Sequence, residues 1–317
     1  MENEIKVSVS CITYNHEKYI EQAIQSFLMQ KTDFKYEILI HDDASTDSTA
    51  DIIKKYQQMY PDIIKPVLQS ENQYSRGVKH ISYTYNFNRA KGKYIALCEG
   101  DDYWTDKYKL QKQVDYMESD SECTLCTHSV KRVGTESAND IGLIRPSKVN
   151  RELDIREFIL GGGMFIGTNS ILFPKKIIDD LPTWFFDAHA GDYPLQIFLA
   201  NHGKAYYIDE TMSAYRVNVQ GSWTNRVYFS YEQRIEHFKR VAKMLDEINE
   251  YTEYKYNKEV EIRKRCNLKD VVQYTCYILM KEGRFDELNK GKFKRFYNEL
   301  SNQEKVELYV SFRGIRL

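Results

Sequence analysis

Residues 93–104 read KYIALCEGDDYW, and they join an apolar strand to a dense cluster of acids. The apolar run 94–98, bounded by glycines, predicts a buried β-strand. Glu99, Asp101 and Asp102 follow it directly, and carboxylates this close repel one another unless a positive partner neutralises them. A hard divalent cation is the natural partner, because it prefers carboxylate oxygens and accepts phosphate oxygens as further ligands. The stretch therefore predicts a metal site, with a solvated acidic turn that caps the next helix as the alternative.

Strand and helix signals alternate along the chain up to residue 133. Short apolar runs predict strands, and stretches with a helical period predict the helices between them. Strands are expected at 7–12, 36–40, 63–68, 94–98 and 123–133, and helices at 17–30, 49–60, 79–91 and 106–118. This alternation favours an α/β fold with a mostly parallel sheet that is covered by helices on both faces.

Polar residues follow three of these strands at the point where each strand ends. Ligands of parallel sheets bind outside the carboxyl ends of the strands, so we expect one binding site along this edge. Its candidates are Thr13, Tyr14 and Asn15 after the first strand, Asp42 and Asp43 after the second, and Glu99, Asp101 and Asp102 after the fourth. Carboxylates there can accept hydrogen bonds from a nucleotide's base or ribose, although an adjacent pair of acids can also simply cap the next helix.

The chain after residue 133 is less regular. Residues 134–152 predict an irregular loop, helices are expected at 152–160 and 191–202, and short strands at 165–173, 205–208 and 212–217. From residue 227 the pattern is helical, with apolar stripes that must pack against the rest of the chain or a second copy in a homo-oligomer. We therefore expect a domain over 1–226, with halves 1–133 and 134–226, and a helical region over 227–317.

The charge balance bears on the partners of the protein. The 317 residues carry 45 Lys and Arg against 46 Asp and Glu, so the net charge of −1 provides no electrostatic case for nucleic acid. Residues 255–317 are different, with 15 Lys and Arg against 9 Asp and Glu. Within them, KGKFKRFY at 290–297 interleaves basic and aromatic residues, which indicates contact with an anionic membrane surface or a solvated helix face.

Cysteine usage and hydropathy bear on the compartment. The six cysteines lack a second pair with zinc-like spacing and indicate reduced, mostly buried thiols. No apolar run approaches the ~20 residues that a membrane-spanning helix needs. We expect a cytoplasmic protein, in solution or held peripherally at the inner face of the membrane.

Three segments together resemble the inverting glycosyltransferases of family 2. They read VSVSCITYNHEKYIEQAIQSFLMQ at 7–30, ILIHDDASTDST at 38–49, and AKGKYIALCEGDDYWTDKYKLQKQVDYM at 90–117. The resemblance extends over about residues 5–221 and implies the GT-A fold, a Rossmann-like sheet flanked by helices, here with an α-helical C-terminal extension. It implies a hexosyl- or N-acetylhexosaminyltransferase that moves a sugar from a nucleotide-sugar, UDP-linked by expectation, to an acceptor hydroxyl. The implied setting is bacterial-type surface polysaccharide or glycoconjugate synthesis.

The resemblance also assigns roles to the acids. In the family, the first acidic pair holds the nucleoside, which places Asp42 and Asp43 there. The D-x-D motif contacts the ribose and binds Mn²⁺ or Mg²⁺ against the diphosphate, and here Glu replaces its first Asp. We carry the metal role to Asp101, a ribose or metal role to Glu99, and support of metal or donor sugar to Asp102. Asn86 lies near a position where the family often has an Asn at the donor site.

Inverting transfer needs a base that takes the proton from the acceptor hydroxyl. The family usually supplies it from a Glu-Asp pair at a helix start, and this chain has Gly191-Asp192 there. Asp192 is thus the predicted base, with a helix-capping role as the alternative. Asp187 is the fallback base, and the nearby His189 is interpreted as structural.

Four further features belong to the resemblance or lie near it. Tyr215-Arg216 matches the family's Tyr-Arg, and Arg216 can stabilise the leaving diphosphate or form an ordinary surface pair. Asn218 stands where a His commonly follows. The turn LGGGMFIG at 160–167 lacks a phosphate-loop signature and is predicted to line an acceptor pocket. Trp184 and Trp223 are candidates for sugar stacking or for the core.

The expected partners are a nucleotide-sugar donor and a glycan or lipid-linked glycan acceptor. A sugar nucleotidyltransferase is the rival enzyme, but CITYNHEKY after the first strand lacks the Gly- and Lys-rich signature that it should have. A dehydrogenase lacks its glycine fingerprint here. A non-catalytic module that binds a nucleotide or glycan stays open, because the usual Glu-Asp pair and the His are missing.

Overall fold

The computed structural model describes residues 4–135, 140–188, 191–219, 222 and 231–281, and beyond these only scattered positions up to residue 305. The chain divides into two compact units, Met1–Val219 and Gln220–Leu317. The division lies a few residues before the boundary expected after residue 226. Trp223 and most of the basic stretch 290–297 lie outside the described residues, as does His189.

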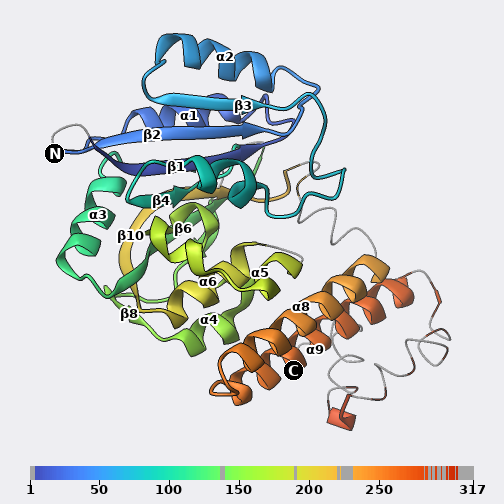
Figure 1. Ribbon diagram of the computed structural model, residues 1–317. Coiled ribbons are helices and arrows are strands. Elements are labelled where there is room, and N and C mark those ends of the chain that lie inside the picture. The colour runs from blue at the N-terminus through green and yellow to red at the C-terminus, as the bar shows by residue number, and fades with distance from the viewer. Residues whose placement is uncertain are drawn as a thin grey trace. The chain divides into compact units, whose positions relative to one another are not determined.

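The first part of the sheet is parallel throughout (Figure 1). Its strands lie in the order β3, β2, β1, β4, with bounds Ile64–Leu68, Lys35–Asp42, Ile5–Thr13 and Tyr94–Leu97. Val7 and Val9 on one face of β1 and Ser8 and Ser10 on the other are all buried, as expected for a strand that is covered on both sides. The helices are α1 (Ile20–Leu28), α2 (Thr49–Met59) and α3 (Lys109–Ser119). The predicted strand–helix alternation is confirmed here.

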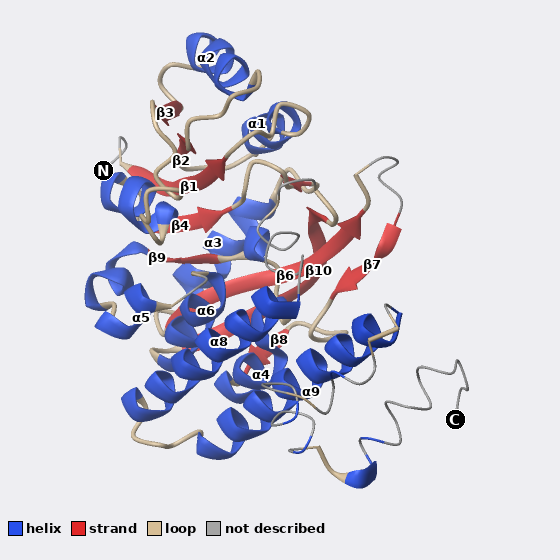
Figure 2. Ribbon diagram, turned by 90° about the vertical axis from the view of Figure 1, so that its right-hand side faces the viewer, coloured by secondary structure: helices blue, strands red, loops and turns tan. Residues whose placement is uncertain are grey.

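The second part of the same sheet is mixed, and Figure 2 shows it continuing from β4 through β9 and β6 to β10. The strands are β9 (Leu172–Pro174), β6 (Cys123–Val133), β10 (Lys204–Arg216) and β5 (Tyr103–Trp104), with β7 (Asp140–Ile144) on β6 and β8 (Arg151–Leu153) on β10. Only β6 and β10 pair in parallel; the other pairs here are antiparallel. The helices are α4 (Ile155–Gly161), α5 (Thr183–Asp187) and α6 (Asp192–Asn201).

Several expected elements were wrong in this part of the sheet. The expected loop 134–152 contains β7 and β8, and the latter pairs with a strand more than fifty residues away. The expected strand 165–173 is a 3₁₀ turn, Thr168–Ser170, followed by the short β9. The two strands expected between 205 and 217 are the single strand β10, whose pairing with β6 shifts register in the middle. Pairing with distant partners decides these segments, and local periodicity carries little of that information.

One expected helix in the parallel part also takes another form. Residues 79–91 contain a π-helical turn, Ser82–Asn86, and a 3₁₀ turn, Phe87–Arg89, instead of an α-helix. The Asn86 amide bonds into β1, and the Arg89 guanidinium donates to the Lys65 carbonyl (2.8 Å) and the Ile40 carbonyl (3.2 Å). Through these two side chains, the segment is hydrogen-bonded to three strands of the sheet. The need to place both side chains on the sheet explains why the segment is not a regular α-helix.

The second unit is helical where it is described. It contains α8 (Tyr231–Tyr251) and α9 (Asn257–Lys281), which pack against each other. Val272, Cys276 and Leu279 of α9 form a small buried cluster with Leu300. Across both units, no described helix is long and apolar enough to cross a membrane. All six cysteines are free, and only Cys266 is exposed.

Candidate active site

Three strand ends meet at the edge where the sequence predicts a site. The Asp43 amide donates to the Thr13 carbonyl (3.0 Å), and the Gly100 amide donates to the Ile12 carbonyl (2.9 Å). A Cβ on Gly100 would lie 2.7 Å from the Thr13 side chain, so the close approach of the two loops requires glycine. The polar groups after β1, β2 and β4 are therefore brought together, as predicted.

The two acids after β2 are already hydrogen-bonded within the protein. Asp42 accepts from the Ser45 amide (3.1 Å) and from the Ser45 hydroxyl. Asp43 accepts from the amides of Gln73 (2.8 Å) and Tyr74 (3.1 Å), which fastens the loop after β3. Burial raises the pKa of the Asp42 carboxyl, and the bonds from Ser45 oppose that rise. Both carboxylates are buried and hold the surrounding loops in place.

The turn after β1 is tied to the same loop. Asn15 has φ 56°, a left-handed conformation that Asn tolerates, and its side-chain oxygen accepts from the Thr46 amide (2.8 Å). Tyr14 beside it is 38% exposed and presents a flat aromatic surface. The Thr13 hydroxyl is buried, with no hydrogen-bond partner among the described residues. This turn can therefore offer both a stacking surface and an unused hydroxyl.

The last of the three acids after β4 is structural. Asp102 is fully buried and accepts from the Arg216 amide (2.8 Å) and from Asn169 Nδ2 (3.0 Å). Asn169 in turn donates to the Ala214 carbonyl (3.0 Å) and accepts from the Ser213 hydroxyl (2.9 Å). Asp102 thereby joins the loop after β4 to the end of β10.

Glu99 and Asp101 are in a different state. Neither carboxylate accepts a hydrogen bond from any residue that the structure describes. Burial raises the pKa of Glu99 to about 8, and repulsion from Asp101 and Asp192 adds to the rise. The same kind of burial and repulsion raises the pKa of Asp102. Arg216 opposes the rise at Asp102, but the carboxylates of Glu99 and Asp101 are left without a hydrogen bond from the described residues.

His16 is a residue that sequence reasoning missed. Its Nε2 lies 3.9 Å from an Asp101 carboxylate oxygen, and its Nδ1 is buried without a partner among the described residues. The His16 amide donates to the Thr49 hydroxyl (2.9 Å), which fixes the backbone of the turn. The sequence feature that could have indicated His16 is its position directly after Asn15, in the polar segment that follows β1.

Arg216 is buried, with 8% of its surface exposed, which excludes an ordinary surface pair. Its guanidinium donates to the Asp101 carbonyl and to Gln22 Oε1. It also lies 4.8 Å and 4.6 Å from the ring centroids of Tyr19 and Tyr103. These contacts position the backbone of Asp101.

Asp192 stands at the start of α6, where Gly191 rather than Asp192 occupies the cap position. Its carboxylate accepts from the Tyr193 amide (2.8 Å) and lies 3.5 Å from the Thr168 hydroxyl. Burial raises the pKa of Asp192, and these hydrogen bonds oppose the rise. Asp192 repels Glu99 electrostatically, so the second half of the domain delivers it toward the acids after β4. The fallback candidate Asp187 lies exposed at the end of α5.

The chain is similar to known proteins both in sequence and in structure. A family model described as Glycosyl transferase family 2 matches residues 8–180, more than half of the chain. The chain belongs to glycosyl transferase family 2. An uncharacterized Mycobacterium tuberculosis protein is 37% identical over 218 residues, which are 68% of this chain and 60% of that protein. The family 2 chain thus spans about 60% of the length of the first curated relatives that it matches.

Another relative and two solved structures carry more informative names. An Escherichia coli UDP-Glc:alpha-D-GlcNAc-diphosphoundecaprenol beta-1,3-glucosyltransferase is 36% identical over 36% of this chain and 42% of its own. S. aureus TarS 1–349 with UDP-GlcNAc aligns over 97% of this chain and 80% of its own, at 16% identity and TM-score 0.59. A Pyrobaculum calidifontis mannosyltransferase with GDP-Man and Mn²⁺ aligns over 98% of this chain and 87% of its own, at 15% identity and TM-score 0.54. These structural likenesses confirm the expected GT-A fold.

A divalent cation suits the donor set of this family 2 domain. Glu99 and Asp101 offer hard carboxylate oxygens that accept no hydrogen bond from the described residues. Within the described part of the chain, no three His, Cys, Asp or Glu side chains lie close enough together to form a complete metal cage. One or two carboxylates, completed by phosphate oxygens and water, are the usual Mg²⁺ arrangement. The residues therefore fit a cation that is shared with a bound diphosphate.

Two predicted contacts are fully used inside the protein. Asn86 is buried, its Nδ2 donates to the Ser10 hydroxyl and the Cys11 carbonyl (both 3.1 Å), and its oxygen accepts from Arg89 (2.9 Å). Asn86 therefore braces the sheet, and its contact with a nucleotide stays a prediction that this geometry does not favour. Trp184 is 9% exposed, which places it in the core rather than on a stacking surface.

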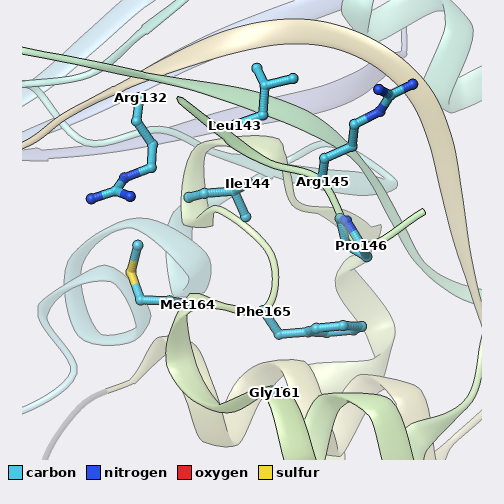
Figure 3. Close-up of a pocket in the computed structure, with 8 residues that line it drawn as sticks. All are labelled: Arg132, Leu143, Ile144, Arg145, Pro146, Gly161, Met164 and Phe165. Carbon is cyan, nitrogen blue, oxygen red and sulfur yellow. The ribbon is translucent and has the colours of Figure 1, made fainter. Parts of the chain in front are cut away.

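The second half of the domain contains a hollow. A pocket of about 360 Å³ is lined by Arg132, Leu143, Ile144, Arg145, Pro146, Gly161, Met164 and Phe165 (Figure 3). Three of these residues belong to the glycine-rich turn at 160–167, so that turn does line a pocket. Whether an acceptor occupies the pocket stays a prediction.

Proposed function

We propose that this family 2 protein is a metal-dependent inverting glycosyltransferase that moves a sugar from a UDP-sugar to an acceptor hydroxyl. The observation that carries the proposal is the state of Glu99 and Asp101, two neighbouring carboxylates that accept no hydrogen bond from the described residues, with Glu99 close enough to Asp192 to be repelled by it. Carboxylates that are largely removed from water and accept no hydrogen bond are costly, so they persist where a ligand supplies the partner. A diphosphate with its cation is such a ligand.

The donor would lie along the edge formed by β1, β2 and β4. Tyr14 offers a surface for the base, and the buried Thr13 hydroxyl offers a hydrogen bond. Asp101 and Glu99 would hold Mn²⁺ or Mg²⁺, which neutralises charge on the departing diphosphate. Asp42 and Asp43 act through the loops that they hold, and Arg216 acts by positioning Asp101.

Asp192 would serve as the base. It takes the proton of the acceptor hydroxyl while the hydroxyl oxygen forms a bond to the anomeric carbon. The bond between that carbon and the diphosphate oxygen breaks, and its electron pair leaves with UDP. Attack opposite the leaving group gives a β-linked product from an α-linked donor. The raised pKa of Asp192 suits proton transfer, because a base works best when its pKa approaches the working pH.

Names of similar proteins support the choice of donor and acceptor class. One relative acts on UDP-Glc and a diphosphoundecaprenol-linked sugar, and one structural neighbour is a complex with UDP-GlcNAc. We therefore propose a UDP-sugar and a lipid-linked glycan acceptor in surface polysaccharide synthesis. Such an acceptor favours a cytoplasmic protein that works at the inner face of the membrane.

Incubation with a panel of nucleotide-sugars and Mn²⁺ tests the proposal. UDP-sugars should be hydrolysed slowly without acceptor, and chelation of the metal should stop the reaction. Tight UDP binding with no turnover of any donor would favour a non-catalytic nucleotide-binding module instead. The glycine at position 191, where the family usually has Glu, is the observation that keeps this second candidate.

A further inference from the structure

The pocket on the second half of the domain has an unusual combination of surfaces. Ile144 and Phe165 line it with hydrocarbon, and Leu143 and Met164 expose 47% and 55% of their surfaces. Figure 3 shows Met164 pointing toward the Arg132 guanidinium across the pocket. No acid is among the eight described lining residues. The pocket therefore offers positive charge directly beside an apolar surface.

The two arginines of the pocket differ in how they are paired. Arg145 forms two hydrogen bonds with Asp209, at 2.7 Å and 2.6 Å, so its charge is already neutralised. The Nε of Arg132 is buried, and no described residue accepts a hydrogen bond from it. A guanidinium in this state is suited to a phosphate, which it can bind through two parallel hydrogen bonds.

The pocket is connected to the proposed base through a short segment. Gly161, Met164 and Phe165 line the pocket, and Thr168 of the same segment lies 3.5 Å from Asp192. The hydroxyl of Tyr193, the residue after the base, donates to the Ile159 carbonyl of α4 (2.7 Å). An acceptor that places its hydroxyl at Asp192 can therefore extend along this segment into the pocket.

We propose that the pocket binds the part of the acceptor that follows the reacting sugar, namely a phosphate joined to a hydrocarbon chain. The phosphate pairs with Arg132, and the first part of the chain lies on Ile144, Met164 and Phe165. This inference rests on the proposed function, since it names the acceptor class of the same site. It also makes Arg132 a specificity residue of the second half of the domain.

Calorimetric titration of farnesyl phosphate into protein saturated with UDP and Mn²⁺ tests this inference. Farnesyl phosphate should bind, while inorganic phosphate and farnesol, which each lack one half of the ligand, should bind at least tenfold more weakly. Arg132→Gln should weaken farnesyl phosphate about tenfold or more, which corresponds to about 1.4 kcal/mol. Met164→Glu, an exposed position that tolerates a polar side chain, should do the same by placing a negative charge at the pocket.

Arg156→Gln is the matched control, because Arg156 lies on α4 outside the pocket and pairs with Asp154. It should change the affinity less than twofold, and all three variants should bind UDP as the wild type does. Unchanged farnesyl phosphate binding in Arg132→Gln and Met164→Glu, or equal binding of inorganic phosphate, would overturn the pocket assignment. Failure of the wild type to bind UDP would instead contradict the proposed function, so the two failures are distinguishable.

Discussion

The acids after β2 and the acids after β4 lie at the same edge of the sheet but are in opposite states. Asp42 and Asp43 accept hydrogen bonds from backbone amides and a hydroxyl, and thereby hold two loops. Glu99 and Asp101 accept none from the described residues, and the pKa of Glu99 rises to about 8. Acids that are close in sequence therefore have two roles: some hold the loops of the site through hydrogen bonds, and others stay available to a ligand. Asp102 belongs to the second cluster in sequence, but it accepts hydrogen bonds from Arg216 and Asn169 and therefore has the same role as Asp42 and Asp43.

The largest expected effect is on catalysis, at Asp192. Asp192→Asn removes the base, so kcat should fall roughly 10²–10⁴-fold, the usual contribution of a positioned proton acceptor. UDP affinity with Mn²⁺ should stay within twofold, because Asp192 belongs to the acceptor side. Steady-state kinetics and calorimetry on the same preparation measure both quantities. Normal turnover in this variant would remove Asp192 from the mechanism.

An acid that holds loops through hydrogen bonds should contribute to the stability of the protein more than to its affinity for metal. Asp43→Ala leaves the amides of Gln73 and Tyr74 without their acceptor, and should lower the free energy of unfolding by about 1–3 kcal/mol. Asp51→Ala is the control, since Asp51 is exposed and pairs with Lys54 alone among the described residues, and it should stay within about 0.5 kcal/mol of wild type. Urea denaturation compares the two. Equal stability of both variants would show that the hydrogen bonds of Asp43 do not hold the fold together.

Replacement of Glu99 should change the free energy of unfolding by a smaller amount, and the change should depend on pH. Its pKa is about 8 in the folded protein and 4.5 in the ordinary state, so the folded protein binds the proton more tightly and loses stability as pH rises between these values. In metal-free protein, Glu99→Gln should therefore raise stability by about 1–2 kcal/mol at pH 8.5 and change little at pH 4. Thermal denaturation in chelator measures this. A variant that is destabilised at pH 8.5 would contradict the assignment of Glu99 as an unpaired acid.

The parallel half of the fold could be predicted from sequence because its strands are short runs rich in apolar residues, and stretches with a helical period separate most of them. The mixed half could not, because β8 and β9 are three residues long and owe their form to partners far along the chain. At the candidate site, residue types and spacing predicted that the acids after β2 and β4 lie at one edge of the sheet, and the structure brings them together there. They carried no information on which acid accepts hydrogen bonds, since those donors, such as Asn169 for Asp102, come from loops that are distant in sequence.

The side chains that sequence reasoning placed differently show the same limit. Asn86 and Arg216 have the chemistry of ligand-binding groups, yet both are committed to contacts within the protein. His16 was passed over, and the structure places it beside Asp101. Only the folded arrangement distinguishes a polar group that is satisfied from one that is not.

Calorimetric titration of UDP into wild type and Asp101→Asn, each with Mn²⁺ and with chelator, tests whether Asp101 holds the cation. Wild type should bind UDP at least tenfold more tightly with Mn²⁺, and Asp101→Asn should lose that gain while its affinity in chelator is unchanged. Such a result would establish Asp101 as an acid that is reserved for the cation and diphosphate. Retention of the full Mn²⁺-dependent gain in Asp101→Asn would contradict the account.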